Sequence, residues 1–410
     1  MTYRLSISPT GSDDPDLDRS LVAAVERVRV DLAAGDLACL TVAGDGAELV
    51  VLQDEAERIA AGADDVLVLG IGGSSLAAQT LVALAPGQRG PVRQHLFDNI
   101  DPQTWADMLG GLQPERTHVL AVSKSGGTAE TLCQTLLAVD WLTAAGCTLS
   151  EHLTVISEPG PRPLRDFAEA AGARVLDHAP DIGGRFSALS LAGLLPALLA
   201  GLDASAVRQG AVAVIDGLLR DGLQSPVALG ARSLVGHERR GIAVQVVMPY
   251  ADRLGALARW WSQIWGESLG KDGKGSTPFA ATGVTDQHSQ LQLWCDGPKR
   301  HMVTVLGVAP DGVGPVMTTD HDALGYLDGR TMGDLLGAER EATCESLIAA
   351  GVPVRRFMVD RVDERALGAL FAHFMLETIL VAHMMGVDPF GQPAVEVGKQ
   401  RARDKLKAMG

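Results

Sequence analysis

Short apolar runs alternate along the chain with longer stretches of helical composition. Residues 65–69 read DVLVL and are followed by the glycine turn GIGGSS and a stretch rich in Ala and Leu. The same order recurs at residues 118–142, where HVLAVS precedes KSGGT and AETLCQTLLAVDWL. Apolar runs of this length are typical of buried strands, and the stretches after them are typical of helices. Each segment therefore predicts a strand, a loop and a helix.

The alternation continues towards the C-terminal end. We expect further strands at residues 153–158, 173–177, 242–250, 301–308 and 354–360, with helices near 227–238 and through Trp260, Trp261 and Trp265. Strands that alternate with helices favour parallel sheets that are covered on both faces. The sequence therefore predicts the α/β class, as two three-layer α/β/α sandwich domains with mainly parallel sheets.

The length of the chain favours more than one domain. A chain of 410 residues exceeds the size at which one hydrophobic core normally stops growing. We expect an N-terminal helical segment at residues 1–50, the first sandwich at 51–205, and the second at 206–410, which ends in a C-terminal helix.

One segment, residues 366–388, is strongly apolar but contains His373, Glu377 and His383. This pattern predicts a helix buried between domains or subunits rather than a membrane anchor. No stretch has the length of an uncharged membrane span, and the first residues lack the basic and apolar regions of an export signal. We therefore expect neither membrane association nor export.

Charge and cysteine usage limit the possible partners. A net charge of −15 repels nucleic acid and anionic lipid, so an anionic ligand needs a local cluster of donors, and a small molecule is the expected partner. Five widely spaced cysteines without a CxxC pair predict neither a disulfide framework nor a zinc site, and they fit a reducing cytoplasm. No His, Asp and Glu cluster has ligand spacing, so we expect no metal and no cofactor.

Two loops have the composition of anion-binding sites. Glycines at 70, 72 and 73 precede Ser74 and Ser75, and residues 123–131 read SKSGGTAET before a helix. Backbone N–H groups and hydroxyls at a helix N-terminus bind anions, although both loops could also be ordinary turns. Ser75 replaces the last glycine of a dinucleotide fingerprint, and the P-loop pattern G-x-x-x-x-G-K-[ST] is absent. The two loops therefore predict an anion site of the phosphate-binding kind rather than a dinucleotide or nucleoside triphosphate site.

The two loops belong to an ordered series of motifs. GIGGS, SKSGGTAET, GGRFS, ESLGK, DQHS and QPAVEVGK follow one another between residues 65 and 399. In this order they resemble the glucose-6-phosphate isomerase family. The resemblance implies a pair of sugar isomerase (SIS) domains, usually in a homodimer. It also implies interconversion of glucose 6-phosphate and fructose 6-phosphate through an enediol, an aldose–ketose isomerisation of glycolysis and gluconeogenesis.

The resemblance also implies substrate-binding residues. The phosphate would be bound by the second loop, and the sugar would contact the first loop and one amide of the C-terminal segment. By this resemblance the substrate-binding residues are Gly73, Ser74, Ser123, Lys124, Ser125, Thr128 and Gln392.

Four further residues match the catalytic groups of the family. Arg185 in GGRFS would face the negative charge of the enediolate. Glu267 in ESLGK would carry a proton between C2 and C1, partly shielded from water by the tryptophans beside it. His288 in DQHS would assist ring opening from the partner subunit, and Lys399 would approach the ring oxygen. The resemblance therefore implies a dimer with shared active sites.

Other functions remain open at this point. Sugar isomerase domains also serve as non-catalytic sugar-phosphate regulators, and a dual isomerase would also accept mannose 6-phosphate. An amidotransferase-type isomerase is disfavoured because no N-terminal cysteine nucleophile is present. The basic end of the chain, residues 399–410, is interpreted as charge that complements a helix macrodipole.

Overall fold

The first domain is built on a sheet of five parallel strands. The computed structural model describes residues 3–9, 14–85 and 90–409. The strand order is β3-β2-β4-β5-β6. Its strands are β2 (Asp65–Leu69), β3 (Arg93–Phe97), β4 (Thr117–Val122), β5 (Leu153–Ser157) and β6 (Arg174–Asp177). The helices of this part are α3 (Gly46–Gly62), α4 (Leu76–Val82), α5 (Pro102–Gly110), α6 (Ala129–Ala144), α7 (Leu149–His152), α8 (Pro163–Ala170) and α9 (Leu191–Leu199).

Alternate residues of the first sheet enter two different cores. Leu67 and Leu69 of β2 pack in an outer core with residues of α6 and α8. Val66 and Val68 face the opposite side, where α3, α4 and α9 cover the sheet. This alternation is the period of two expected for a strand. The domain therefore has the three predicted layers.

The second domain is built on five strands in the order β1-β10-β9-β7-β8. All pairs are parallel except β1 with β10, in which Tyr3 lies opposite Val359. The strands are β1 (Tyr3–Ser8), β7 (Val244–Pro249), β8 (Thr277–Ala280), β9 (His301–Val308) and β10 (Val354–Val359). The remaining helices are α1 (Pro15–Ala34), α2 (Ala38–Thr41), α10 (Ala204–Asp221), α11 (Pro226–Glu238), α12 (Gly255–Leu269), α13 (Leu291–Asp296), α14 (Met332–Ala349), α15 (Glu364–Met385) and α16 (Pro393–Met409).

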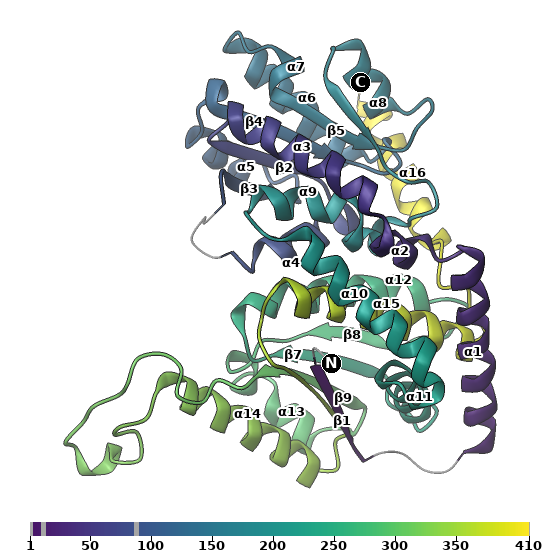
Figure 1. The fold of residues 1–410 in the computed structure, drawn as a ribbon, viewed down its shortest axis with the longest axis vertical. Helices are drawn as coiled ribbons and strands as arrows, with labels where there is room; N and C mark the ends of the chain where they lie inside the picture. Colours follow the sequence, from purple (N-terminus) through teal and green to yellow (C-terminus); the bar gives the residue numbers. More distant parts are fainter. Residues whose placement is uncertain (1–2, 10–13, 86–89, 410) are drawn as a thin grey trace.

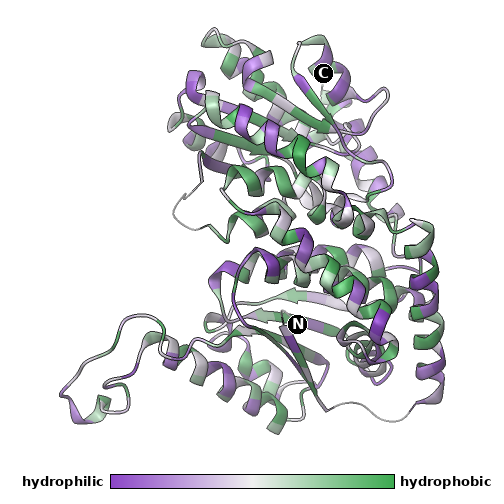
Figure 2. Cartoon of the chain, viewed as in Figure 1, coloured by the Kyte–Doolittle hydropathy of each residue, from purple (hydrophilic) through white to green (hydrophobic). Residues whose placement is uncertain are grey.

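One continuous core joins the two domains. It contains buried residues of α9, α10, α12 and α15 together with residues from the inner faces of both sheets. Figure 1 shows the two sheets one above the other with these helices between them, and Figure 2 shows that the strands and the helices packed on them are mostly hydrophobic. The α/β sandwich prediction is therefore confirmed.

The predicted helical segment at residues 1–50 is wrong at its start. Residues 3–8 form β1, an edge strand of the second sheet. The helix α1 begins only at Pro15, where the Asp14 carboxylate accepts hydrogen bonds from Asp16 and Leu17 N–H as an N-cap. It ends at Gly35, which has a left-handed conformation with φ 82°. The N-terminal end of the chain therefore contributes to the second domain.

The apolar segment near the C-terminal end forms α15. Among the described helices, only α15 has the length and composition of a membrane span, and 94% of its apolar window is buried inside the protein. It packs against α10, α11, α1 and α12. His373 and Glu377, which interrupted the apolar pattern, are fully buried and bonded to each other, with Nε2 3.2 Å from Oε1. The helix is thus the centre of the shared core.

Candidate active site

The two predicted anion loops leave the same edge of the first sheet. Residues 70–75 follow β2 and residues 123–128 follow β4, and these strands are parallel neighbours. Gly73 touches the segment that contains Arg185, because a Cβ built on Gly73 would lie 2.3 Å from the carbonyl carbon of Gly184. Ser187 Oγ donates to Gly73 O at 3.3 Å. Only glycine allows this close approach.

The second loop gathers hydroxyl groups at the start of α6. Ser123 is buried, and its Oγ lies 3.2 Å from Thr128 Oγ1. Ser125 Oγ lies 3.5 Å from the same oxygen and accepts from Gly127 N–H at 3.3 Å. Thr128 is the N-cap position of α6, but its side chain accepts no bond from the N–H groups of the first turn. These N–H groups and hydroxyls are suited to an anion.

The side chain of Lys124 lies elsewhere. Its Nζ donates to Pro180 O at 2.8 Å and forms an ion pair with Glu158 at 3.2 Å. Glu158 also pairs with Arg162, whose Nη2 lies 2.7 Å from the second carboxylate oxygen. Lys124 and Arg162, which packs against Gly126 of the loop, therefore share one carboxylate. The role of Lys124 as a phosphate ligand stays a prediction.

Arg185 is the buried centre of the site. It lies in the short 3-10 helix η4 (Gly184–Leu189) and is 5% exposed. Its Nε donates to Ser268 Oγ at 2.9 Å, and its Nη1 lies 3.3 Å from Glu267 Oε2 and 2.9 Å from Gln392 Oε1. Burial lowers the pKa of the guanidinium, and the carboxylates of Glu267 and Asp388 oppose this shift. Three predicted site residues therefore meet here.

Arg185 also holds the connection between α15 and α16, residues 386–392, which we call the α15–α16 linker. It shares this task with Lys271 and Lys274, which follow α12. All five hydrogen bonds end on backbone carbonyl oxygens, those of Met385, Asp388, Pro389, Phe390 and Gly391. These bonds position Gln392 at the end of the linker.

Glu267 lies in the last turn of α12 and its side chain is 31% exposed. Gln263, one turn earlier, donates from Nε2 to Glu267 Oε1 at 2.9 Å. The predicted shielding by tryptophans is wrong, because Trp261 and Trp265 belong to the shared core. Trp265 precedes Glu267 by two residues, which places it on nearly the opposite face of the helix. The neighbours of the carboxylate are therefore Arg185 and Gln263.

Gln263 is a site residue that the motif series did not single out. Gly72, in the first loop, has φ +56°, and a Cβ built on it would lie 2.9 Å from Gln263 Nε2. The amide thus connects the first loop to Glu267. Its spacing of four residues before Glu267 in a helical segment was the available signal, since such pairs share one helix face.

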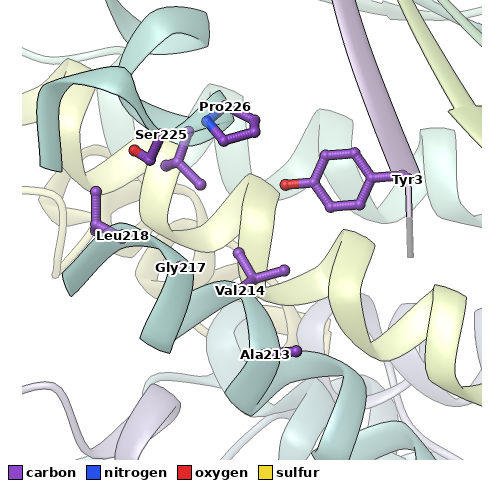
Figure 3. Close-up of a pocket in the computed structure, with 8 residues that line it drawn as sticks. Tyr3, Ala213, Val214, Gly217, Leu218, Ser225 and Pro226 are labelled. Atoms are coloured by element: carbon purple, nitrogen blue, oxygen red, sulfur yellow. The ribbon is translucent and has the colours of Figure 1, made fainter. Parts of the chain in front are cut away.

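A pocket of about 530 Å³ adjoins this group and has the size of a small-molecule site. Glu267, Lys271 and Gln392 are among the residues that line it. A smaller cavity of about 40 Å³ lies in the second domain. Figure 3 shows residues that line it, among them Tyr3, with its hydroxyl directed inwards, and Val214. That cavity holds water at most and is too small for a hexose phosphate.

Two predicted catalytic residues lie on the surface. Lys399, on α16, is half exposed and its Nζ donates to Glu396 Oε1 at 2.7 Å. His288 follows the short helix η7 (Thr285–Gln287) and is exposed. Within the described residues, neither side chain is bonded to Arg185 or Glu267. The structure therefore joins Arg185, Glu267 and Gln392, and leaves Lys399 and His288 outside this group.

The comparisons with known proteins identify the family. A family model described as phosphoglucose isomerase matches residues 56–304. The glucose-6-phosphate isomerase of Rubrobacter xylanophilus is 39% identical over 84% of this chain and 83% of its own length. The chain belongs to the phosphoglucose isomerase family. A relative with the same name from Thermus thermophilus is 38% identical, with 84% of each chain covered.

Solved structures extend the likeness to nearly the whole chain. A hypothetical protein of Thermus thermophilus has a TM-score of 0.89 and 34% identity, with 98% of this chain and 100% of that chain covered. A glucose-6-phosphate isomerase of Chlamydia trachomatis has the same fold, with a TM-score of 0.83, 22% identity and coverage of 100% and 89%. The range that the family model matches includes Gly73, Arg185 and Glu267, and it ends before Gln392 and Lys399.

Proposed function

We propose that this chain interconverts glucose 6-phosphate and fructose 6-phosphate, as the names of its relatives state for them. The observation that carries the proposal is the contact between Arg185 and Glu267, 3.3 Å apart beside a pocket of about 530 Å³. A proton acceptor next to a fixed cation suits a reaction in which a proton leaves carbon and negative charge develops on oxygen.

In the proposed reaction the loop at residues 123–128 binds the phosphate through hydroxyls and N–H groups. The Glu267 carboxylate accepts the proton from C2 and returns it to C1, while a second proton moves between the oxygens on C1 and C2. Arg185 stabilises the enediolate oxygens between these steps. Gln263 holds the orientation of the carboxylate through its bond to Oε1. Atoms and charge balance without an added reactant, and no metal is required.

Ring opening is assigned to Lys399 and to His288 of a second subunit. His288 is exposed, as a residue that completes the site of a neighbouring chain would be.

Residues 310–331 form an arm that projects from the second domain in Figure 1 and has exposed apolar side chains, of which Tyr326 is 72% exposed and Val313 61%. An arm of this kind supports a homodimer, because exposed apolar groups favour burial between chains. Sedimentation equilibrium should give twice the chain mass, and a monomer that is fully active would contradict the shared site.

The alternatives differ in what they require of the site. A non-catalytic regulator needs the phosphate loop, but it does not need a carboxylate held by both Arg185 and Gln263. A dual isomerase would use the same groups, and it would differ only in accepting both configurations of the sugar at C2. The cytoplasmic location also stays a prediction, and it is supported by the five cysteines, all of which are free thiols.

The deciding experiment supplies fructose 6-phosphate to the purified chain and couples glucose 6-phosphate to its dehydrogenase. We expect turnover by the wild type and a loss of about 10²–10⁴-fold in kcat for Glu267→Gln. The exposed Glu57→Gln on α3 is the matched control and should keep wild-type kcat. Absence of wild-type turnover would refute the proposal. The same coupling, started from mannose 6-phosphate, tests the dual isomerase, and added EDTA should leave the rate unchanged.

A further inference from the structure

The helix α16 carries a basic surface that the proposed reaction uses only at Lys399. None of its described side chains is buried, and Figure 1 shows it leaving the second domain and running beside α8 of the first. Its cationic residues are Lys399, Arg401, Arg403, Lys405 and Lys407. A general macrodipole effect explains basic residues at a helix end, but it does not explain a specific contact with another domain. Arg403 makes such a contact.

Arg403 lies against the loop that starts α6. Its Nη2 donates to Gly127 O at 3.1 Å. A Cβ built on Gly127 would meet only two described atoms within 4 Å, Ser125 O at 3.9 Å and Arg403 Nη2 at 4.0 Å. The space that a side chain at residue 127 would enter is therefore open, with Arg403 at its edge. Gly127 N–H also donates to Ser125 Oγ, so the guanidinium lies one residue from the hydroxyl cluster.

The charges around the loop leave room for a further cation. Lys124 and Arg162 both pair with Glu158, so these three groups together carry one positive charge. A phosphate monoester carries about −1.5 to −2 charges near pH 7. Arg403 forms no ion pair within the described part of the chain, and the guanidinium has five N–H donors, of which the Gly127 contact uses one. Its charge and donors are thus available to an anion on the loop.

We propose that Arg403 is a phosphate-binding residue of the active site, which adds a second positive charge to the loop at residues 123–128. The inference rests on the proposed function, because it takes the ligand of this loop to be the phosphate of a sugar. The planar guanidinium donates two parallel N–H groups to phosphate oxygens, a geometry that lysine cannot reproduce.

The position of Arg403 on α16 gives this contact a second effect. Lys399 lies four residues earlier and therefore on the same face of the helix. Phosphate bound by Arg403 fastens this face to the first domain, next to the loop that holds the substrate. Lys399 pairs with Glu396 in the present structure. Because Lys399 also lies on α16, binding of the substrate phosphate to Arg403 fixes the position of the helix that contains Lys399. Arg403 thus binds phosphate directly and acts on Lys399 as a positioning residue.

The test uses the full chain and calorimetric titration with inorganic phosphate and with fructose 6-phosphate. Arg403→Gln should weaken the binding of both ligands about tenfold, as expected for the loss of a charge-assisted hydrogen bond. The Kd of Arg403→Lys should lie between those of wild type and Arg403→Gln. Lysine keeps the positive charge, but it cannot donate two parallel N–H groups to the phosphate. The control is Arg401→Gln, which removes the same charge from the opposite side of α16 and should bind within twofold of wild type. Equal Kd values for Arg403→Gln and Arg401→Gln would overturn the proposal.

Kinetics separate this inference from the proposed function. If the wild type turns over substrate, KM for fructose 6-phosphate should rise about tenfold in Arg403→Gln, and the inhibition constant of inorganic phosphate should rise with it. A fall in kcat or in melting temperature with unchanged phosphate affinity would assign Arg403 a structural role and refute its role in binding. If the wild type binds phosphate but shows no turnover, the isomerase proposal fails, while the calorimetric comparison of Arg403 with Arg401 still decides the binding role.

Discussion

Arg185 Nη1 lies 3.3 Å from Glu267 Oε2, although the two residues are 82 positions apart in the chain and come from different domains. The guanidinium is fixed on its other sides by Ser268, Gln392 and two carbonyl oxygens of the α15–α16 linker. A cation held in this way does not have to reorganise when charge develops beside it, and such preorganisation is a major source of catalysis. The shared core fixes the two domains relative to each other, and it therefore also fixes the relative position of Arg185 and Glu267.

Replacing Arg185 with lysine should therefore lower kcat by about 10²–10³. A single ammonium group cannot bond to Ser268, Gln392 and the linker at the same time. The coupled assay gives kcat, and the melting temperature checks the fold. The control is Arg356→Lys, which alters a half-buried ion pair with Glu341 in the second domain and should leave kcat unchanged. A kcat within fivefold of wild type for Arg185→Lys would contradict the role of a guanidinium fixed by several hydrogen bonds.

Gly73→Ala should disturb both stability and activity. The new Cβ would lie 2.3 Å from the Gly184 carbonyl carbon and 2.5 Å from Arg185 N, so backbone must move. We expect a loss of about 1–3 kcal/mol in the free energy of unfolding in urea, as is typical of overpacking, together with reduced kcat. Gly62→Ala, at the end of α3, adds a Cβ with no described atom within 4 Å and should keep both values. Equal behaviour of the two variants would refute the close packing at Gly73.

Stability should fall as the pH drops from 6.5 to 4, in part because of His118. Burial lowers the pKa of His118 from 6.5 to about 4, and its ring nitrogens bond to Glu151 O and Thr154 Oγ1. Between these values the unfolded chain binds a proton that the folded chain does not, so the free energy of unfolding rises with pH. A difference of this size corresponds to about 3 kcal/mol over the whole window.

Urea titrations at several pH values test this prediction. His118→Gln should make the dependence less steep between pH 4 and 6.5, because one titrating group is lost. The exposed His321→Gln is the matched control and should keep the wild-type slope. An unchanged slope for His118→Gln would mean that the proton is taken up elsewhere.

Lys271→Met should reduce kcat by about tenfold with little change in melting temperature. The variant keeps the length of the side chain and removes the ammonium group that bonds to Asp388 O and Phe390 O. Gln392 would then be less well held, and the linker should be cleaved faster in limited proteolysis. Lys299→Met, which removes another exposed ammonium bonded to a carbonyl oxygen in α13, should affect neither measurement. Faster cleavage without loss of kcat would show that the linker does not support catalysis.

Local patterns were sufficient to predict most of the central strands. The apolar runs that form β2, β4, β5, β9 and β10 are buried, so burial itself produces the pattern. The runs that form β3 and β8 were not predicted, because these edge strands are only partly buried and contain polar residues or Pro278. The position of β1 depends on Val359 and its neighbours, more than 300 residues away. No local pattern contains that pairing.

The site was predictable where motifs define short loops, and less so where separate elements meet. Glu267 and Arg185 were both expected, but the interpretation of Trp265 as a neighbour of the carboxylate ignored the helical period. Gln263 was visible by spacing and was not singled out. The contact between Arg403 and Gly127 exists because α16 crosses to the other domain, which is a property of the tertiary structure alone.

The way in which the α15–α16 linker is held has a consequence for natural variation. Apart from the bond between Arg185 and the Gln392 side chain, the hydrogen bonds that Arg185, Lys271 and Lys274 make to this region end on main-chain carbonyl oxygens. Every residue type carries that oxygen, including proline. Side chains at 388 and 390 can therefore change without removing these acceptors, whereas Gly391 has φ +68°, which favours glycine, and loss of one of the three cations removes the bonds themselves. Sequence change at 388 and 390 thus alters the wall of the pocket while the pair of Arg185 and Glu267 stays in place.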